Sequence, residues 1–347
     1  MKKLLLFIFL LVTCGIVTTA KAQDINNDPG AYMNAVTDAE TLMNKSYMTY
    51  VSASAHSSRK RKIEKLRGAA IDAILTCQGT INYLPAFKGD NSLKQSSITY
   101  VKLCYKIFND DYAHIVNMDD IAERSYDEMQ AYLLLQQATN DTLEVAINRI
   151  TTAQEKFAAK YNVTLSHEKT ELGDKMEATN RMDRYHNKVY LLFYKCNWED
   201  NQLTDAINQK NVTKIEQTRS ALGKYATEGL AVLDTLHSFE NDASLAGACK
   251  QALVFYSNEA TTQIPKVTDF FLKEENFNKL KAAMDAKGNQ RTQQDVDTFN
   301  KSVNDINAAV ATYNQTNDYL NNGRNEVNKS WMDTEKAFID AHTPYYK

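Results

Sequence analysis

The sequence predicts an all-α protein made of a tandem duplication of two antiparallel four-helix bundles, and three observations support this. Helix breakers are scarce, because only 11 Gly and 4 Pro occur in 347 residues. Apolar residues recur at helical spacing, as in the stripe formed by Ile98, Val101, Tyr105, Phe108, Tyr112 and Ile115. Part of the chain also repeats itself at a sequence offset of 152, which indicates a duplicated unit.

The repeat is clearest between residues 62–93 and 214–245. The segment KIEKLRGA at the start of the first stretch returns as KIEQTRSA at the start of the second, and 214 − 62 gives the offset of 152. Without a gap, 10 of these 32 positions are identical, where unrelated sequences of this composition would share roughly two. Farther along, Tyr161 falls on Tyr313 at the same offset, so we expect the repeat to continue through each copy.

The apolar stripes and the few breakers place the helices. In the first copy we expect them at roughly 31–56, 58–84, 90–116 and 119–164, and in the second at roughly 170–207, 211–237, 242–273 and 276–340, the last broken near Gly288. Asp90 and Asp242 each precede a helix at matching turns, where they can act as caps. The boundary between the copies is expected near Ser166, which gives domains at 23–166 and 167–347.

The segment 1–22 has the pattern of a signal peptide. Two lysines precede the apolar run Leu4–Val12, and the small residues of Ala20–Ala22 close the segment. No later run approaches the ~20 apolar residues of a spanning helix, so we expect none in the mature chain. Cys14 follows LVT, which resembles the lipobox of bacterial lipoproteins, although Thr13 departs from the small residue of that pattern. Cys14 is therefore either a lipid anchor or an ordinary residue of the signal peptide.

Charge gives few indications of a partner. The chain has 40 Lys and Arg against 43 Asp and Glu, a net charge of −3, so no overall field favours nucleic acid. The one basic run, Arg59–Lys62, lies at the expected start of a helix. It is either a solvated face or a contact for an anionic envelope partner.

Three Asp-x-x-His pairs are the candidate metal ligands: Asp111 with His114, Asp183 with His186, and Asp234 with His237. Residues three apart share one face of a helix, so each pair could offer a carboxylate and an imidazole to one ion. Di-metal four-helix proteins use Glu-x-x-His pairs that converge with further carboxylates. Because these pairs contain Asp and do not recur at the 152 offset, we favour exposed helical pairs and expect no metal or other cofactor.

The remaining chemistry is sparse. Cys77, Cys104, Cys196 and Cys249 could form two disulfides in three connectivities, but several lie on apolar stripes, which favours buried thiols. The sequence contains no Gly-x-Ser-x-Gly, His-Glu-x-x-His, phosphate loop or dinucleotide fingerprint. These observations favour a protein that is not an enzyme.

One stretch, YKIFNDDYAHIVNMDDIAERSYDEMQAYLLLQQ at Tyr105–Gln137, resembles an uncharacterised family of exported, all-helical bacterial surface proteins. The resemblance implies a location and a helical body, and no activity. We therefore expect a non-enzymatic binding or structural module in the periplasm or on the outer-membrane surface of a Gram-negative bacterium, with an envelope protein or polysaccharide as partner. The alternatives are a metal-binding protein or metalloenzyme that uses the Asp-x-x-His pairs, and a small-molecule or lipid carrier with a cavity between helices.

Overall fold

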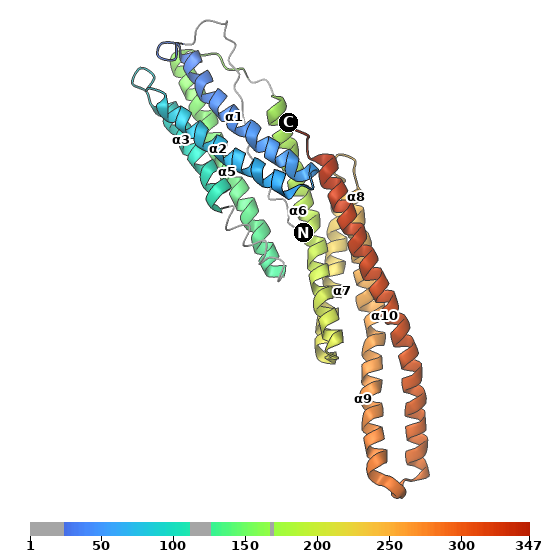
Figure 1. The fold of residues 1–347 in the computed structure, drawn as a ribbon. Coiled ribbons are helices and arrows are strands. Elements are labelled where there is room, and N and C mark those ends of the chain that lie inside the picture. Colours follow the sequence, from blue (N-terminus) through green and yellow to red (C-terminus); the bar gives the residue numbers. More distant parts are fainter. Residues whose placement is uncertain (1–23, 112–125, 167–169) are drawn as a thin grey trace. The chain divides into compact units, whose positions relative to one another are not determined.

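A computed structural model describes residues 24–111, 126–166 and 170–347, and these residues are helical and contain no β-strand (Figure 1). The helices are α1 (Pro29–His56), α2 (Lys60–Tyr83), α3 (Ser92–Tyr105), α5 (Tyr126–Tyr161), α6 (Glu171–Asn208), α7 (Val212–Thr235), α8 (Ser244–Asn258), α9 (Ile264–Lys287) and α10 (Gln293–His342). Two π-helical segments, η1 (Lys106–Asp111) and η2 (Glu259–Gln263), follow α3 and α8, and the 3-10 turn η3 (Gly288–Gln290) follows α9. The prediction of an all-α protein is confirmed.

The chain divides into two compact units. The first runs to Tyr185 and includes the C-terminal residues Ile339–Lys347, and the second is His186–Phe338. The division falls inside α6, C-terminal to the boundary expected near Ser166. None of the helices in the described ranges combines the length and apolar character that a membrane span requires.

In the first unit, α1, α2, α3 and α5 pack side by side (Figure 1). Helix α1 begins where it does because the Asp28 carboxylate accepts hydrogen bonds from the amides of Gly30 and Ala31, at 2.8 and 3.1 Å. At one end of the unit the buried rings of Tyr32, Phe87 and Phe157 lie within 5.3–5.6 Å of one another, centroid to centroid. These rings join α1 and α5 to the turn between α2 and α3.

That turn occurs twice in the chain. Residues Phe87–Asp90 and Phe239–Asp242 each form a tight turn whose end residues exchange two backbone hydrogen bonds of 2.7–3.0 Å. The two central residues have positive φ in both turns, 50° and 84° in the first and 48° and 71° in the second, as in a type I′ turn. The flanking helices keep the offset found in the sequence. The first residues of α2 and α7 are Lys60 and Val212, those of α3 and α8 are Ser92 and Ser244, and both pairs differ in number by 152.

This common offset ends before the last helix of each unit. Phe157 of α5 packs edge-on against the turn residue Phe87, with centroids 5.5 Å apart and planes at 65°. Phe338 of α10 meets Phe239 in the same way, at 5.6 Å and 66°. Because 338 − 157 is 181 rather than 152, the second unit has a longer segment between its turn and its last helix.

The extra length lies in the hairpin of α9 and α10, which run side by side (Figure 1). Contrary to expectation, no helix ends near residue 273; α8, η2 and α9 continue to Lys287, and the chain reverses at Gly288, where φ is +48°. The sequence around 273 contains helix-forming Lys and Glu and no breaker, which explains the difference. Matching Tyr161 to Tyr313 was wrong, because Tyr313 belongs to the hairpin and stacks on Phe270 at 4.4 Å.

The C-terminal residues contact the end of α1 within the first unit. His56 lies 2.7 Å from the Asp340 carboxylate through Nδ1 and 2.9 Å from the Thr343 carbonyl oxygen through Nε2. Its ring also stacks on Tyr345 at 3.6 Å between centroids. Both ring nitrogens of His56 thus lie within hydrogen-bond distance of an oxygen from the C-terminal residues.

Candidate functional site

The pair Asp183 and His186 does not form a shared ligand set. The Nε2 atom of His186 lies 2.8 Å from Oε1 of Glu335, and its ring stacks on Tyr190. Asp183 instead has one buried carboxylate oxygen with no hydrogen-bond partner, and burial raises the pKa of Asp183 well above its ordinary value. The two residues thus have separate surroundings.

The other candidate ligands also remain apart where the structure describes them. Asp234 accepts a hydrogen bond of 2.7 Å from Lys250, and His237 is exposed just beyond the end of α7. Asp111 is the last residue of η1, but its side chain, His114 and Cys14 lie outside the described residues. Within the described parts of the chain, no group of three or more His, Cys, Asp or Glu side chains could hold a metal ion.

The four helical cysteines are buried free thiols. Burial raises the pKa of Cys196 to about 12 and raises the pKa of Cys77, Cys104 and Cys249 as well. The thiolate is the reactive form of cysteine, so these side chains are poor nucleophiles.

A buried polar cluster lies between α1 and α3 of the first unit. The Ser97 hydroxyl donates a hydrogen bond to the Glu40 carboxyl, and both residues are at most 1 % exposed. Burial raises the pKa of Glu40 to about 7. One helical turn along α1, both polar atoms of the Asn44 side-chain amide are buried without a hydrogen-bond partner. Buried polar groups are normally hydrogen-bonded, so this core has unused hydrogen-bonding capacity.

The second unit has a charged cluster of its own. Arg324 of α10 donates to the Asp200 carboxylate of α6 at 2.8 Å and to the Glu259 carboxylate of η2. Both acids are buried, and one oxygen of Glu259 has no partner. Burial raises the pKa of Asp200 and of Glu259 above their ordinary values, although the Arg324 guanidinium beside both acids acts in the opposite direction.

The two clusters do not occur at matching positions. At the offsets of 152 for the earlier helices and 181 for the last, Asp200, Glu259 and Arg324 correspond to the buried apolar residues Met48, Ile107 and Leu143. Conversely, Glu40, Asn44 and Ser97 correspond to Leu192, Cys196 and Cys249. Each helical framework therefore forms without the polar cluster of the other.

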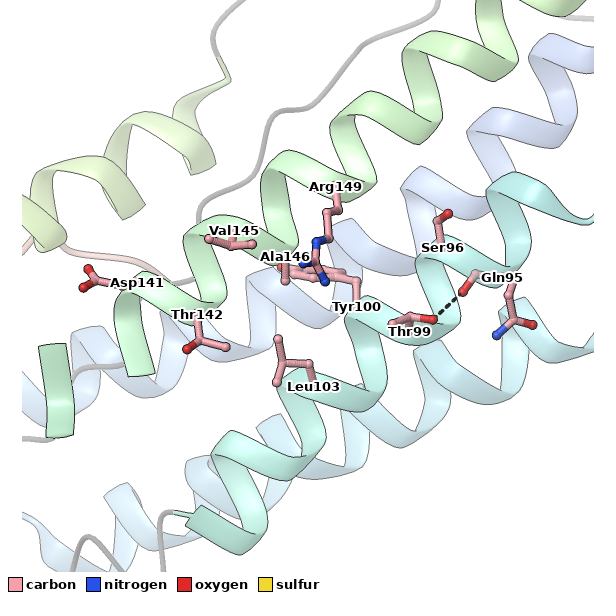
Figure 2. Close-up of a pocket in the computed structure, with 10 residues that line it drawn as sticks. All are labelled: Gln95, Ser96, Thr99, Tyr100, Leu103, Asp141, Thr142, Val145, Ala146 and Arg149. Atoms are coloured by element: carbon pink, nitrogen blue, oxygen red, sulfur yellow. Dashed lines mark hydrogen bonds between the residues drawn. The ribbon is translucent and has the colours of Figure 1, made fainter. Parts of the chain in front are cut away.

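A groove of about 630 Å³ lies between α3 and α5 of the first unit (Figure 2). It is lined by Gln95, Ser96, Thr99, Tyr100 and Leu103 of α3 and by Asp141, Thr142, Val145, Ala146 and Arg149 of α5. Both sets have the spacing i, i+1, i+4, i+5, i+8, so each comes from one face of its helix. The volume is within the range of sites that bind small molecules, ~300–1,000 Å³.

The groove lies where the second unit has a packed contact between a large residue and a glycine. Leu103 corresponds to Phe255 at an offset of 152, and Thr142 corresponds to Gly323 at an offset of 181. In the second unit the ring of Phe255 lies directly against Gly323, where it occupies the space that a β-carbon would need. With Leu103 and Thr142 in these places, the first unit has a groove where the second has a packed contact.

The polar groups of the groove are arranged along its length. Asp141 lies at one end of the groove, whereas the Arg149 guanidinium turns back beside Ala146 and Tyr100, as Figure 2 shows, and neither residue makes an ion pair with a described residue. They are eight positions apart on α5, which is about 12 Å along the helix axis. The hydroxyls of Thr99 and Thr142 donate to the carbonyl oxygens of Gln95 and Ala138, both at 2.8 Å. Their oxygens remain available as acceptors.

None of these groove residues was a candidate from the sequence. The replacement of Leu103 by Phe255 is visible at the 152 offset, and it could have indicated an unfilled position. The match of Thr142 to Gly323 could not be found that way, because it depends on how Phe157 and Phe338 pack on their turns.

Comparisons with protein-family models, curated proteins and solved structures find no match to this chain. The resemblance over Tyr105–Gln137 remains a prediction, and part of that stretch lies outside the described residues.

Proposed function

We propose that the chain is a non-enzymatic binding module of the cell envelope and that its ligand lies in the groove between α3 and α5. The observation that carries this proposal is the contrast between the two units. The same helical framework is closed by Phe255 against Gly323 in one unit and left open at Leu103 and Thr142 in the other.

We also propose that the two units arose by tandem duplication of a four-helix bundle, with the α9–α10 hairpin extended in the second. The recurring type I′ turn, the equal spacing of α2 with α7 and of α3 with α8, and the two matching phenylalanine pairs support this. A duplicated framework allows one half to keep a packed core while the other acquires a site.

Export to the periplasm or to the outer-membrane surface of a Gram-negative bacterium is part of the proposal. It rests on the signal-peptide pattern of the segment 1–22 and on the resemblance to exported surface proteins. An envelope protein or polysaccharide is the expected partner, and a lipid anchor at Cys14 remains an alternative to an ordinary signal-peptide cysteine.

A small-molecule or lipid carrier is the second candidate, and the volume of the groove favours it over a purely structural role. The metal-binding alternative gains no support from the described residues, because His186 and Asp234 are engaged with Glu335 and Lys250.

Native mass spectrometry of the protein purified from its own envelope fraction tests this proposal. The wild type should carry an additional mass that is lost on denaturation. The double variant Leu103→Phe with Thr142→Gly, which imitates the closed contact of the second unit, should lack it. Leu272→Phe, at a half-exposed position of α9, is the matched control and should retain the mass. An identical additional mass in the groove-closing variant, or none in the wild type, would contradict the proposal.

A further inference from the structure

We infer that the groove binds a short zwitterionic peptide, about a tripeptide in length, with free ends and small apolar side chains. This inference rests on the proposed function and specifies the ligand class. It follows from three properties of the groove: the two opposite charges on α5, the acceptors on its walls and the apolar surface between them.

The opposite charges of Asp141 and Arg149 set the length and the polarity of the ligand. Arg149 is an exposed cation suited to a carboxylate, and Asp141 is an exposed anion suited to an ammonium group. Their α-carbons are about 12 Å apart along α5, which matches an extended peptide of about three residues at roughly 3.3–3.6 Å per residue when the exposed Arg149 side chain swings away from the middle of the groove. A ligand with one charge would leave the other end unsatisfied.

The walls favour a ligand that donates hydrogen bonds between its ends. The hydroxyl protons of Thr99 and Thr142 are already donated to carbonyl oxygens of their own helices, so both oxygens face the groove as acceptors. Peptide N–H groups are donors of this kind. A sugar could also donate, but it would not offer the two opposite end charges.

The middle of the groove is apolar. Leu103, Val145 and Ala146 line it, and Val145 is 50 % exposed. Burying this surface favours side chains such as Ala and Val, which are small enough for a groove only one helix spacing wide. The predicted orientation places the peptide N-terminus near Asp141 and the C-terminus near Arg149.

Isothermal titration calorimetry of the full chain with the tripeptide Ala-Val-Ala tests the inference. N-acetylation or C-terminal amidation of the peptide should each weaken binding by about 10-fold or more, because each removes one end charge. Asp141→Asn should remove the sensitivity to acetylation, and Arg149→Gln should remove the sensitivity to amidation. The exchanged variant Asp141→Arg with Arg149→Asp should also bind the free peptide, with the peptide C-terminus now near residue 141 and its N-terminus near residue 149. Equal affinity for the free, acetylated and amidated peptides, or no binding of any of them, would overturn the inference.

The two proposals fail in different ways. If no form of the peptide binds but the wild type still carries a mass that the groove-closing variant lacks, the site stands and the ligand class is wrong. If peptide binding survives Leu103→Phe with Thr142→Gly, the groove itself is not the site.

Discussion

Glu40 makes stability depend on pH. Its pKa is raised from 4.5 to about 7 by burial, so the folded state keeps a proton that the unfolded state releases. The contribution of protonated Glu40 to the unfolding free energy is complete below about pH 4.5 and is lost as the pH rises through 7. A pKa difference of this size between the folded and unfolded states corresponds to about 3 kcal/mol of unfolding free energy. We expect Glu40→Gln to flatten the dependence of the unfolding free energy on pH between 4.5 and 7, measured by urea denaturation. Glu64→Gln, on the exposed face of α2, should leave the slope unchanged. If the unfolding free energy of Glu40→Gln depended on pH as steeply as that of the wild type, Glu40 would not be the group that causes this dependence.

His56 is expected to control the attachment of the C-terminus. Because it contacts Asp340, Thr343 and Tyr345 together, His56→Gln cannot reproduce both hydrogen bonds and the ring stacking. Residues 343–347 should then be removed by carboxypeptidase several-fold faster than in the wild type, as followed by mass spectrometry. The control is His237→Gln, because His237 is exposed and lies outside this contact. Equal digestion rates in His56→Gln and the wild type would refute the role of His56.

At the scale of helices, the glycines of α2 and α7 should respond in opposite directions to substitution. A β-carbon at Gly68 or Gly79 of α2 meets nothing within 4 Å, so alanine should stabilise the protein by about 0.5–1 kcal/mol through helix propensity. A β-carbon at Gly229 of α7 would collide with Leu253, so Gly229→Ala should destabilise it by about 1–3 kcal/mol. Chemical denaturation measures both effects. Stabilisation by Gly229→Ala would contradict the close packing of α7 on α8.

The starts of α2 and α7 form a second matched pair. Arg59 and Asn211 precede these helices with nearly the same backbone angles, φ/ψ of −86°/87° and −89°/88°. Asn211 accepts a hydrogen bond from the Lys214 amide at 3.0 Å, whereas Arg59 provides no side-chain cap. Arg59→Asn should therefore raise the unfolding free energy by about 0.5–1 kcal/mol, and Asn211→Ala should lower it by about 1 kcal/mol. A loss of stability in Arg59→Asn would indicate that the basic run contributes contacts beyond those described.

The helices and their turns could be predicted largely because local signals determined them. Asp90 and Asp242 each accept a hydrogen bond from the amide two residues later, the first of α3 or α8, and the helices around these turns keep the offset that the sequence repeat shows. The break near Gly288 and the end of α10 agree with the prediction, but the continuous run from α8 through η2 to the end of α9 does not, because a helix end was expected near residue 273 where the sequence has no breaker. The charged cluster around Arg324 was missed because its partners are 65 and 124 residues away in the sequence.

For the whole molecule, we propose that two units with a similar framework differ in use. The first has an open groove and the buried Glu40 cluster, and the second has a closed contact and the buried Arg324 cluster. Sequence spacing indicated the shared framework. The difference between Leu103 and Phe255 is visible in the sequence, but the groove could not be predicted from it, because the match of Thr142 to Gly323 depends on how Phe157 and Phe338 pack on their turns.

Hydrogen–deuterium exchange of the full chain, with and without saturating Ala-Val-Ala, tests this claim most directly. We predict slower exchange in peptides covering residues 92–105 and 141–149, which line the groove, and no change in residues 244–258 of α8, where Phe255 closes the corresponding space. Protection in α8, or no protection in α3 and α5 under saturating peptide, would contradict the assignment of the binding site to the first unit.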